Sequence, residues 1–368
     1  MKVMHLISNR WNSAITEYAL SAIQSLNLAK IECLLCPLSE SPAEKRALQY
    51  RINVKPFKSF GLTQISKLLR AILEFAPDAI FTYGGPETSL VQILRKLGKL
   101  DQKVRIIRFR GQDILIPQNG FKLWKYRLSN QEVDLLITPS MLLKSKYHEQ
   151  FKVAPVEYVI LGCDSNKYRY QAWDGETNRP QILLVGRFDP VKGHGRAFSI
   201  FRHLLDHWDY SWGAPPQLHI VGEPANLKVQ DLKLRVLESG LLLGEDVILT
   251  AERVPDIEKW MSRASVGFIS SLDSEIICRV AEEFLMCGTA VFVSGVGSLE
   301  EVILDNSFGT SYLNDTDLMA AEKLQRLLHE SLREGINGKI KRSQKAQEAF
   351  SWQTMSISLA RVVKKVSI

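Results

Sequence analysis

The chain has 368 residues, of which 45% are hydrophobic and 24% are charged. This composition is typical of a globular protein and excludes a disordered chain, a collagen-like repeat and a small disulfide scaffold. The formal net charge is +7, but residues 1–170 carry 25 Lys and Arg against 14 Asp and Glu, whereas residues 171–368 carry 22 against 26. A basic half joined to an acidic half predicts two lobes with different binding partners, and the basic lobe is expected to bind an anionic partner.

The sequence also predicts where the protein is found. We expect no secretory leader, because the first apolar run ends at residue 8 and Arg10 follows it. The longest stretch without charge, residues 284–299, is shorter than a membrane-spanning helix. Five Cys, an odd number, favour reduced thiols and a cytoplasmic location. Cys33 and Cys36 form a CxxC pair inside an apolar run, so we interpret them as buried strand residues rather than a redox or metal site.

Short apolar runs alternate with amphipathic stretches from the first residue onward. Strands are predicted over residues 2–8, 31–37, 79–83, 104–109, 135–138 and 156–160, and helices over residues 16–26, 65–75 and 89–97. Alternating strands and helices predict a parallel sheet with helices on both faces.

A second series of the same kind follows the polar stretch 164–180. Its predicted strands are residues 181–185, 217–221, 247–250, 266–270 and 290–293, and its predicted helices are residues 195–205, 231–239, 256–263, 280–286, 319–334 and 340–349. The predicted fold class is therefore α/β, with doubly wound parallel-sheet domains at residues 1–165 and 175–350 and a closing helix over residues 355–366. Ligands of such sheets bind beyond the carboxyl ends of the strands, so we expect a cleft between the domains.

The segment 183–193, LLVGRFDPVKG, contains the first candidate site. A predicted strand ends at Gly186, and Arg187 and Lys192 follow in the next loop. Two cations beside a small residue suit the oxygens of a diphosphate, although a surface loop with two solvated cations has the same pattern.

The segment 270–288, SSLDSEIICRVAEEFLMCG, contains the second candidate site. Glu275 lies in the loop after a predicted strand, the next helix starts near Cys278, and Glu283 lies eight residues after Glu275. Backbone N–H groups at a helix start can bind an anion, and a carboxylate can accept hydrogen bonds from vicinal hydroxyls such as a ribose diol. Each Glu could instead complement the helix dipole.

Together these segments resemble the family 4 retaining glycosyltransferases, which have the two-domain GT-B fold. GRFDPVKG is similar to the GR…KG element of that family, and Glu275 with Glu283 matches its E-x7-E motif. The segments LHIVGE, ILTAERVPDIEKWM and VGSLEEVI follow in family order, and TPSMLLKSKY and VILGCD resemble the end of the acceptor domain.

The resemblance implies a role for each matching residue. Arg187 and Lys192 would hold the donor diphosphate, Glu283 the ribose and Glu275 the sugar, and no metal or other cofactor is expected. The implied donor site comprises Gly186, Arg187, Lys192, Arg253, Val254, Glu275, Ile277, Cys278, Arg279 and Glu283, of which Arg187, Lys192 and Glu275 are the catalytic candidates. The closing helix would cross back onto the first domain.

The sequence departs from the family pattern in three places. Ile276, Ile277 and Cys278 replace the glycines of the usual E-G-F-G. Ser13 and Ala14 replace the Gly-Gly pair of the acceptor-side loop after the first strand. Arg110 stands where the family often has His, and Asp113 keeps an acidic position, which makes both catalytic candidates on the acceptor side.

The basic first domain would take the acceptor, in this family often a lipid-linked or lipopolysaccharide-type glycan. The segment FKLWKYRL, residues 121–128, interleaves cations with aromatic residues and could contact an anionic membrane, although a solvated helix would look similar. Nucleic acid is not expected as a partner, because the excess charge is diffuse and no recognition module is present.

The leading hypothesis is a retaining, metal-independent glycosyltransferase that transfers a hexose-type sugar from a nucleotide-diphosphate sugar to a cell-surface glycan or glycolipid. Two alternatives remain. A non-hydrolysing nucleotide-sugar epimerase would need acid–base side chains, yet no His lies between His5 and His148. A non-catalytic sugar-nucleotide-binding subunit would fit the lost glycines, but the four charged motif residues argue against it.

Overall fold

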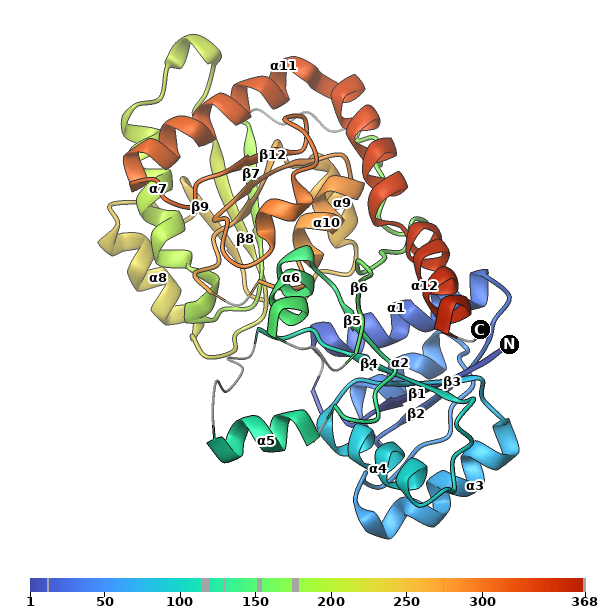
Figure 1. Ribbon diagram of the computed structural model, residues 1–368. Coiled ribbons are helices and arrows are strands. Elements are labelled where there is room, and N and C mark those ends of the chain that lie inside the picture. The colour runs from blue at the N-terminus through green and yellow to red at the C-terminus, as the bar shows by residue number, and fades with distance from the viewer. Residues whose placement is uncertain are drawn as a thin grey trace. The chain divides into compact units, whose positions relative to one another are not determined.

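The computed structural model describes residues 1–11, 13–113, 120–128, 130–150, 154–173, 179–273 and 275–366. The chain forms two compact units (Figure 1). The first unit comprises Met1–Gly162 with Trp352–Ile368, and the second comprises Cys163–Ser351. The chain therefore passes between the units twice, after Gly162 and after Ser351.

The first unit contains a six-stranded sheet in the order β2-β1-β3-β4-β5-β6, and its strand pairs are all parallel. The strands are β1 Lys2–Ile7, β2 Glu32–Pro37, β3 Ala79–Thr82, β4 Arg105–Phe109, β5 Leu135–Thr138 and β6 Val156–Tyr158. The helices are α1 Ala14–Leu28, α2 Pro42–Gln49, α3 Ile65–Phe75, α4 Gly85–Lys96, α5 Gly120–Leu128, α6 Met141–Gln150 and α12 Trp352–Val366. The last of these packs against α1.

The second unit contains another six-stranded parallel sheet, in the order β12-β11-β10-β7-β8-β9. The strands are β7 Gln181–Val185, β8 Gln217–Val221, β9 Val247–Thr250, β10 Val266–Ile269, β11 Ala290–Val293 and β12 Gly309–Ser311. The helices are α7 His194–Asp206, α8 Val229–Glu238, α9 Ile257–Arg263, α10 Arg279–Met286 and α11 Asp317–Phe350. Non-helical backbone at Gly335 interrupts α11.

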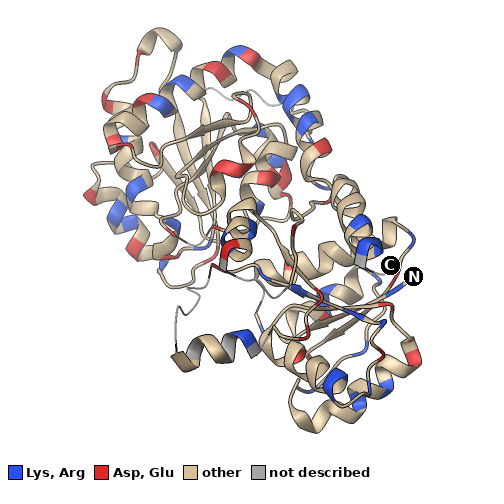
Figure 2. Ribbon diagram, in the orientation of Figure 1, with Lys and Arg blue, Asp and Glu red and all other residues tan. Residues whose placement is uncertain are grey.

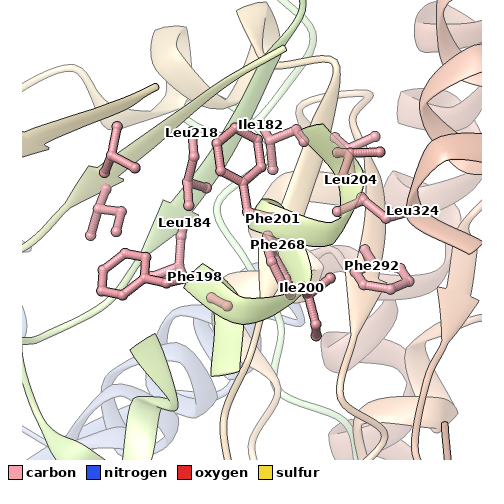
Figure 3. Packing of buried hydrophobic residues seen from close by; sticks show 14 of the residues in the cluster. Ile182, Leu184, Phe198, Ile200, Phe201, Leu204, Leu218, Phe268, Phe292 and Leu324 are labelled. Atoms are coloured by element: carbon pink, nitrogen blue, oxygen red, sulfur yellow. The ribbon is translucent and has the colours of Figure 1, made fainter. Parts of the chain in front are cut away.

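The core of the second unit explains why its central strands are continuous apolar runs. Ile182 and Phe268 on the strands and Phe198 and Phe201 on α7 are at most 1% exposed and belong to one cluster (Figure 3). Strands covered on both faces need apolar side chains at consecutive positions, which is the pattern that the sequence shows.

The predicted α/β fold class with two parallel sheets is confirmed, and eleven predicted strands are found close to their expected positions. β12, α2 and α6 were not predicted from the sequence. The helices expected over residues 319–334 and 340–349 are the two halves of α11, which the break at Gly335 separates.

Arg342, in the second half of α11, connects that helix to the sheet. Its side chain is 3% exposed and donates hydrogen bonds to the carbonyl oxygens of Gly288 and Ser307 and to the carboxylate of Glu334. Gly288 and Ser307 lie just before β11 and β12, so one guanidinium holds both turns against α11.

We predict that Arg342→Met lowers the free energy of unfolding by about 2–4 kcal/mol, because the buried carbonyl groups lose their donor. Lys341→Met is the matched control, since Lys341 is the exposed neighbour on the same helix. Urea unfolding of both variants measures the difference. Equal stability of the two variants would contradict the role given to Arg342.

Candidate functional site

The loop after β7 contains the first group of candidate residues in the second unit. Asp189 is buried, accepts hydrogen bonds from the backbone N–H of Val191 (3.1 Å) and the amide of Asn226 (2.7 Å), and caps the short turn Pro190–Lys192. A Cβ placed on Gly186 would lie 3.7 Å from the Lys192 stem. The end of β7 therefore holds Lys192 against Gly186, as the motif predicts, while Arg187 is exposed beside them.

Lys192 pairs with Glu275, which belongs to the loop after the neighbouring strand β10. The Lys192 ammonium donates to Oε1 of Glu275, and the hydroxyl of buried Ser271 donates to the same oxygen at 2.6 Å. The two side chains are 26% and 13% exposed. Since an ion pair with low exposure is weakly screened, this pair holds the two loops together.

Two glycines allow the loops to approach so closely. Gly193 has φ of +67°, and a Cβ there would lie 2.0 Å from the carbonyl oxygen of Ser270. Gly297, after β11, has φ of +63°, and a Cβ there would lie 2.3 Å from the carbonyl oxygen of Glu275, which accepts a 2.7 Å hydrogen bond from the N–H of Ser298. The loops after β7, β10 and β11 therefore meet at Glu275, and a larger residue at either glycine would separate them.

Helix α10 begins at Arg279, with Cys278 as its N-cap, close to the predicted start. Cys278 provides no side-chain cap, so its side chain leaves the N–H groups of the first turn to other acceptors. Burial, followed by the charge of Glu282, raises the pKa of the Cys278 thiol well above its ordinary value. Cys278 is therefore no thiolate nucleophile.

Glu283, the second acid of the motif, lies in the second turn of α10. Its carboxylate accepts a 2.6 Å hydrogen bond from Nε of Arg279, four residues earlier, and its side chain is 6% exposed. The resemblance includes Arg279 in the implied donor site without giving its side chain a role. In the structure, that side chain neutralises and orients Glu283.

Ile277 is buried in the same loop, between Glu275 and the N-cap Cys278. The other two predicted donor residues lie apart from this group. Arg253 is exposed and Val254 half-buried in the loop after β9, which is separated from β7 by β8 in the sheet.

The predicted residues of the first unit also follow strand ends. Ser13 is the N-cap of α1, Ala14 is the first residue of that helix, and the side chain of Asn9 donates a 2.5 Å hydrogen bond to the Ser13 hydroxyl. Arg110 follows β4 and donates to the side chain of Asn130 at 3.4 Å. Asp113 forms an ion pair with Lys146 of α6.

Sequence reasoning missed four of these polar partners, namely Ser271, Asn9, Asn130 and Lys146. Ser271 and Asn9 could have been found, since each directly follows an apolar strand. Asn130 and Lys146 do not follow a predicted strand, and only the fold brings them to Arg110 and Asp113.

Among the described residues, no group of three or more His, Cys, Asp or Glu is arranged to hold a metal ion. The helices in the described ranges include none that is long and apolar enough to cross a membrane.

Comparison with known proteins supports the sequence resemblance. A family model described as glycosyl transferases group 1 matches residues 167–348. An uncharacterized glycosyltransferase of Methanocaldococcus jannaschii is 26% identical over 270 residues, which cover 71% of this chain and 68% of that protein.

Two solved structures share the architecture over nearly the whole chain. HepE of Anabaena in complex with UDP has a TM-score of 0.78 at 15% identity, covering 99% of this chain and 100% of that one. The sucrose-phosphate synthase of Thermosynechococcus elongatus has a TM-score of 0.73 at 16% identity, covering 99% and 98%. These likenesses show that the two parallel sheets form the GT-B fold. Since the family model matches residues 167–348, the second unit belongs to the glycosyl transferases group 1 family, and the chain as a whole has the GT-B fold.

Proposed function

We propose that this protein is a retaining, metal-independent glycosyltransferase that transfers a hexose-type sugar from a nucleotide-diphosphate sugar to a glycan or glycolipid of the cell surface. The observation that carries the proposal is the meeting of Lys192, Glu275 and the start of α10 at the carboxyl edge of one parallel sheet. Anabaena HepE, whose structures contain UDP and UDP-glucose, supports a nucleotide diphosphate as the donor.

The proposed chemistry needs cations where the leaving group forms. When the bond between the sugar and the diphosphate breaks, negative charge develops on the phosphate oxygens. Lys192, Arg187 and the N–H groups at the start of α10 would stabilise that charge without a metal. In the retaining route, the departing phosphate would accept the proton of the acceptor hydroxyl, so no side-chain nucleophile is required.

The ion pair between Lys192 and Glu275 suggests how the donor is received. A diphosphate brings its own negative charge and can replace Glu275 as the partner of the ammonium group. The released carboxylate of Glu275 can then accept hydrogen bonds from the hydroxyls of the donor sugar. Glu283, held by Arg279, would bind the ribose diol, and the loop at Arg253 and Val254 would lie near the base.

The first unit would bind the acceptor, at the strand ends that carry Ser13, Ala14, Arg110 and Asp113. A peripheral contact with the cytoplasmic face of an anionic membrane is supported by α5. Phe121 and Trp124 are 73% and 56% exposed with ring centroids 5.5 Å apart, and Arg127 is exposed beside them. The side chains of Lys122, Lys125 and Tyr126, which complete the predicted basic and aromatic pattern, lie outside the described residues.

The direct test of the proposal is a panel of UDP-, GDP- and ADP-sugars. Thermal-shift measurements would identify the base, and release of the nucleoside diphosphate without acceptor would detect turnover. We expect stabilisation by one nucleotide class and slow donor hydrolysis. Absence of both across the panel would overturn the proposal, whereas binding without hydrolysis or transfer would indicate a non-catalytic subunit.

We predict that Lys192→Ala lowers the rate of donor turnover by about 10²–10³, because the developing phosphate charge loses a preplaced cation. The measurement is kcat for the donor identified in the panel. Lys345→Ala serves as the control, since Lys345 is 55% exposed and pairs with Asp305 on the surface of the same unit. A loss of similar size in both variants would contradict the assignment.

We predict a different result for Glu275→Gln: UDP binds at least as tightly as to the wild-type protein, while turnover falls by at least about tenfold. The substitution removes the negative charge that competes with the diphosphate for Lys192. Calorimetric titration with UDP and the rate of donor hydrolysis provide the two readouts. A parallel loss of UDP affinity and turnover would show that Glu275 does not compete with the donor.

We predict that replacing both Phe121 and Trp124 with Ser weakens binding to vesicles of phosphatidylglycerol and phosphatidylcholine by about three- to tenfold. Co-sedimentation measures the binding, which added salt should also weaken. Tyr210→Ser is the control, because Tyr210 is an equally exposed aromatic residue (72%) of the second unit. Unchanged binding of the double variant would remove the membrane contact from the proposal.

A further inference from the structure

Helix α10 carries two consecutive acids that are both buried. Glu282 is 3% exposed and Glu283 is 5% exposed. Figure 2 shows acidic positions in red on the helix labelled α10 in Figure 1. Their partners differ, since Glu283 accepts from the guanidinium of Arg279 at 2.6 Å, whereas Glu282 accepts from the thiol of Cys163 at 3.9 Å. A thiol is a weak donor, so it compensates a buried negative charge far less than a guanidinium does.

Two adjacent buried carboxyl groups, of which Glu283 forms an ion pair with Arg279, resist double ionisation. Burial, followed by the charge of Glu283, raises the pKa of Glu282 to about 8, against the opposing effects of Arg279 and the Cys163 hydrogen bond. Glu282 is therefore the protonated member of the pair at neutral pH. Cys163, Cys278, Cys287 and Tyr168 are also coupled to this pair, and burial raises the pKa of each of these groups above its ordinary value.

The segment that begins where the chain enters the second unit holds both acids. Cys163 contacts Glu282, and the hydroxyl of Tyr168, five residues later, hydrogen-bonds to Glu283. The segment is itself fixed, because the N–H of Cys163 donates to the carbonyl of Phe350 at 2.8 Å, and that of Tyr168 donates to the carbonyl of Asp164 at 2.8 Å. Cys163 thus contacts Glu282 through its side chain and Phe350, near the end of the second unit, through its backbone.

We propose that Glu282 is a positioning residue for Glu283: by staying uncharged, it does not compete with Glu283 for Arg279 and keeps the Glu283 carboxylate oriented for the ribose of the nucleotide. This inference rests on the proposed function, since it assumes a nucleotide at Glu283. Deprotonation of Glu282 places a second negative charge beside Arg279, which then divides its attraction between two carboxylates. The affinity for a nucleotide consequently falls as the pH rises through the pKa of Glu282.

The test compares UDP binding to the wild-type protein and to Glu282→Gln between pH 6 and 9 by calorimetry. We expect the wild-type affinity to fall about three- to tenfold more than the variant affinity over this range, because glutamine keeps the shape of the protonated acid but cannot ionise. Ionisation of UDP itself affects both proteins equally. Glu238→Gln, at the exposed end of α8, controls for the change in net charge.

A second variant tests the direction of the effect. Cys163→Ala removes a donor that favours the ionised form of Glu282, so it should move the midpoint of the affinity loss to higher pH. Parallel pH profiles for the wild type and Glu282→Gln, with UDP bound by both, would overturn the positioning role and leave the proposed function intact. No binding of UDP or another nucleoside diphosphate to the wild type at any pH would overturn the proposed function and this inference with it.

A readout without a ligand guards against loss of folding in the variants. The unfolded chain releases the Glu282 proton near the ordinary pKa of about 4.3, whereas the folded protein holds it to about pH 8. The stability contribution of this proton is full below the unfolded pKa and is lost as the pH rises to the folded pKa. Raising the pH from 5 to 8 should therefore lower the free energy of unfolding of Glu282→Gln less than that of the wild type. Identical profiles of unfolding free energy against pH would contradict the protonated state of Glu282.

Discussion

Parallel pairing constrains this protein more than any single contact. Every described strand pair named in the two sheets is parallel, so within each sheet the strands end at the same edge and the loops that follow them are neighbours. In the second unit, the adjacent order β11-β10-β7 brings Ser298, Glu275 and Lys192 together from distant parts of the sequence. The positive φ angles of Gly193 and Gly297 make that approach possible.

Two ion pairs lie at this edge of the sheet, and this pairing limits which ligands can enter. Lys192 is matched by Glu275, and Arg279 by Glu283. Leaving one member of a poorly exposed pair without a partner is unfavourable, so a ligand that displaces Glu275 must supply negative charge of its own. A diphosphate meets that requirement and a neutral sugar does not. Under the proposed function, the pair would discriminate between a nucleotide-activated sugar and a free sugar before any contact with the sugar is made.

Most strands could be predicted from the sequence because buried parallel strands are continuous apolar runs. The run AVFV at β11 shows the pattern, whereas β12, Gly309–Ser311, has three small residues and is recognised only through its pairing with β11. The candidate site also combines features that the sequence predicts with features that only the fold shows. Motif spacing identified Lys192 and Glu275 as candidates. Their ion pair could not be predicted, because 83 residues separate them and the order of strands in the sheet sets the contact.

The replacement of the family glycines after Glu275 changes how this loop is held in place. Ile276, Ile277 and Cys278 are 6%, 8% and 5% exposed, so their side chains are turned into the protein. The thiol of Cys278 also lies 3.9 Å from the carbonyl oxygen of Glu275 and donates to it. Glycines at these positions would leave the backbone free to adapt, whereas three buried side chains fix its course. Packing therefore sets the position of Glu275 and of the first turn of α10, so a donor bound as proposed would lose less entropy on binding and would have to fit a fixed loop.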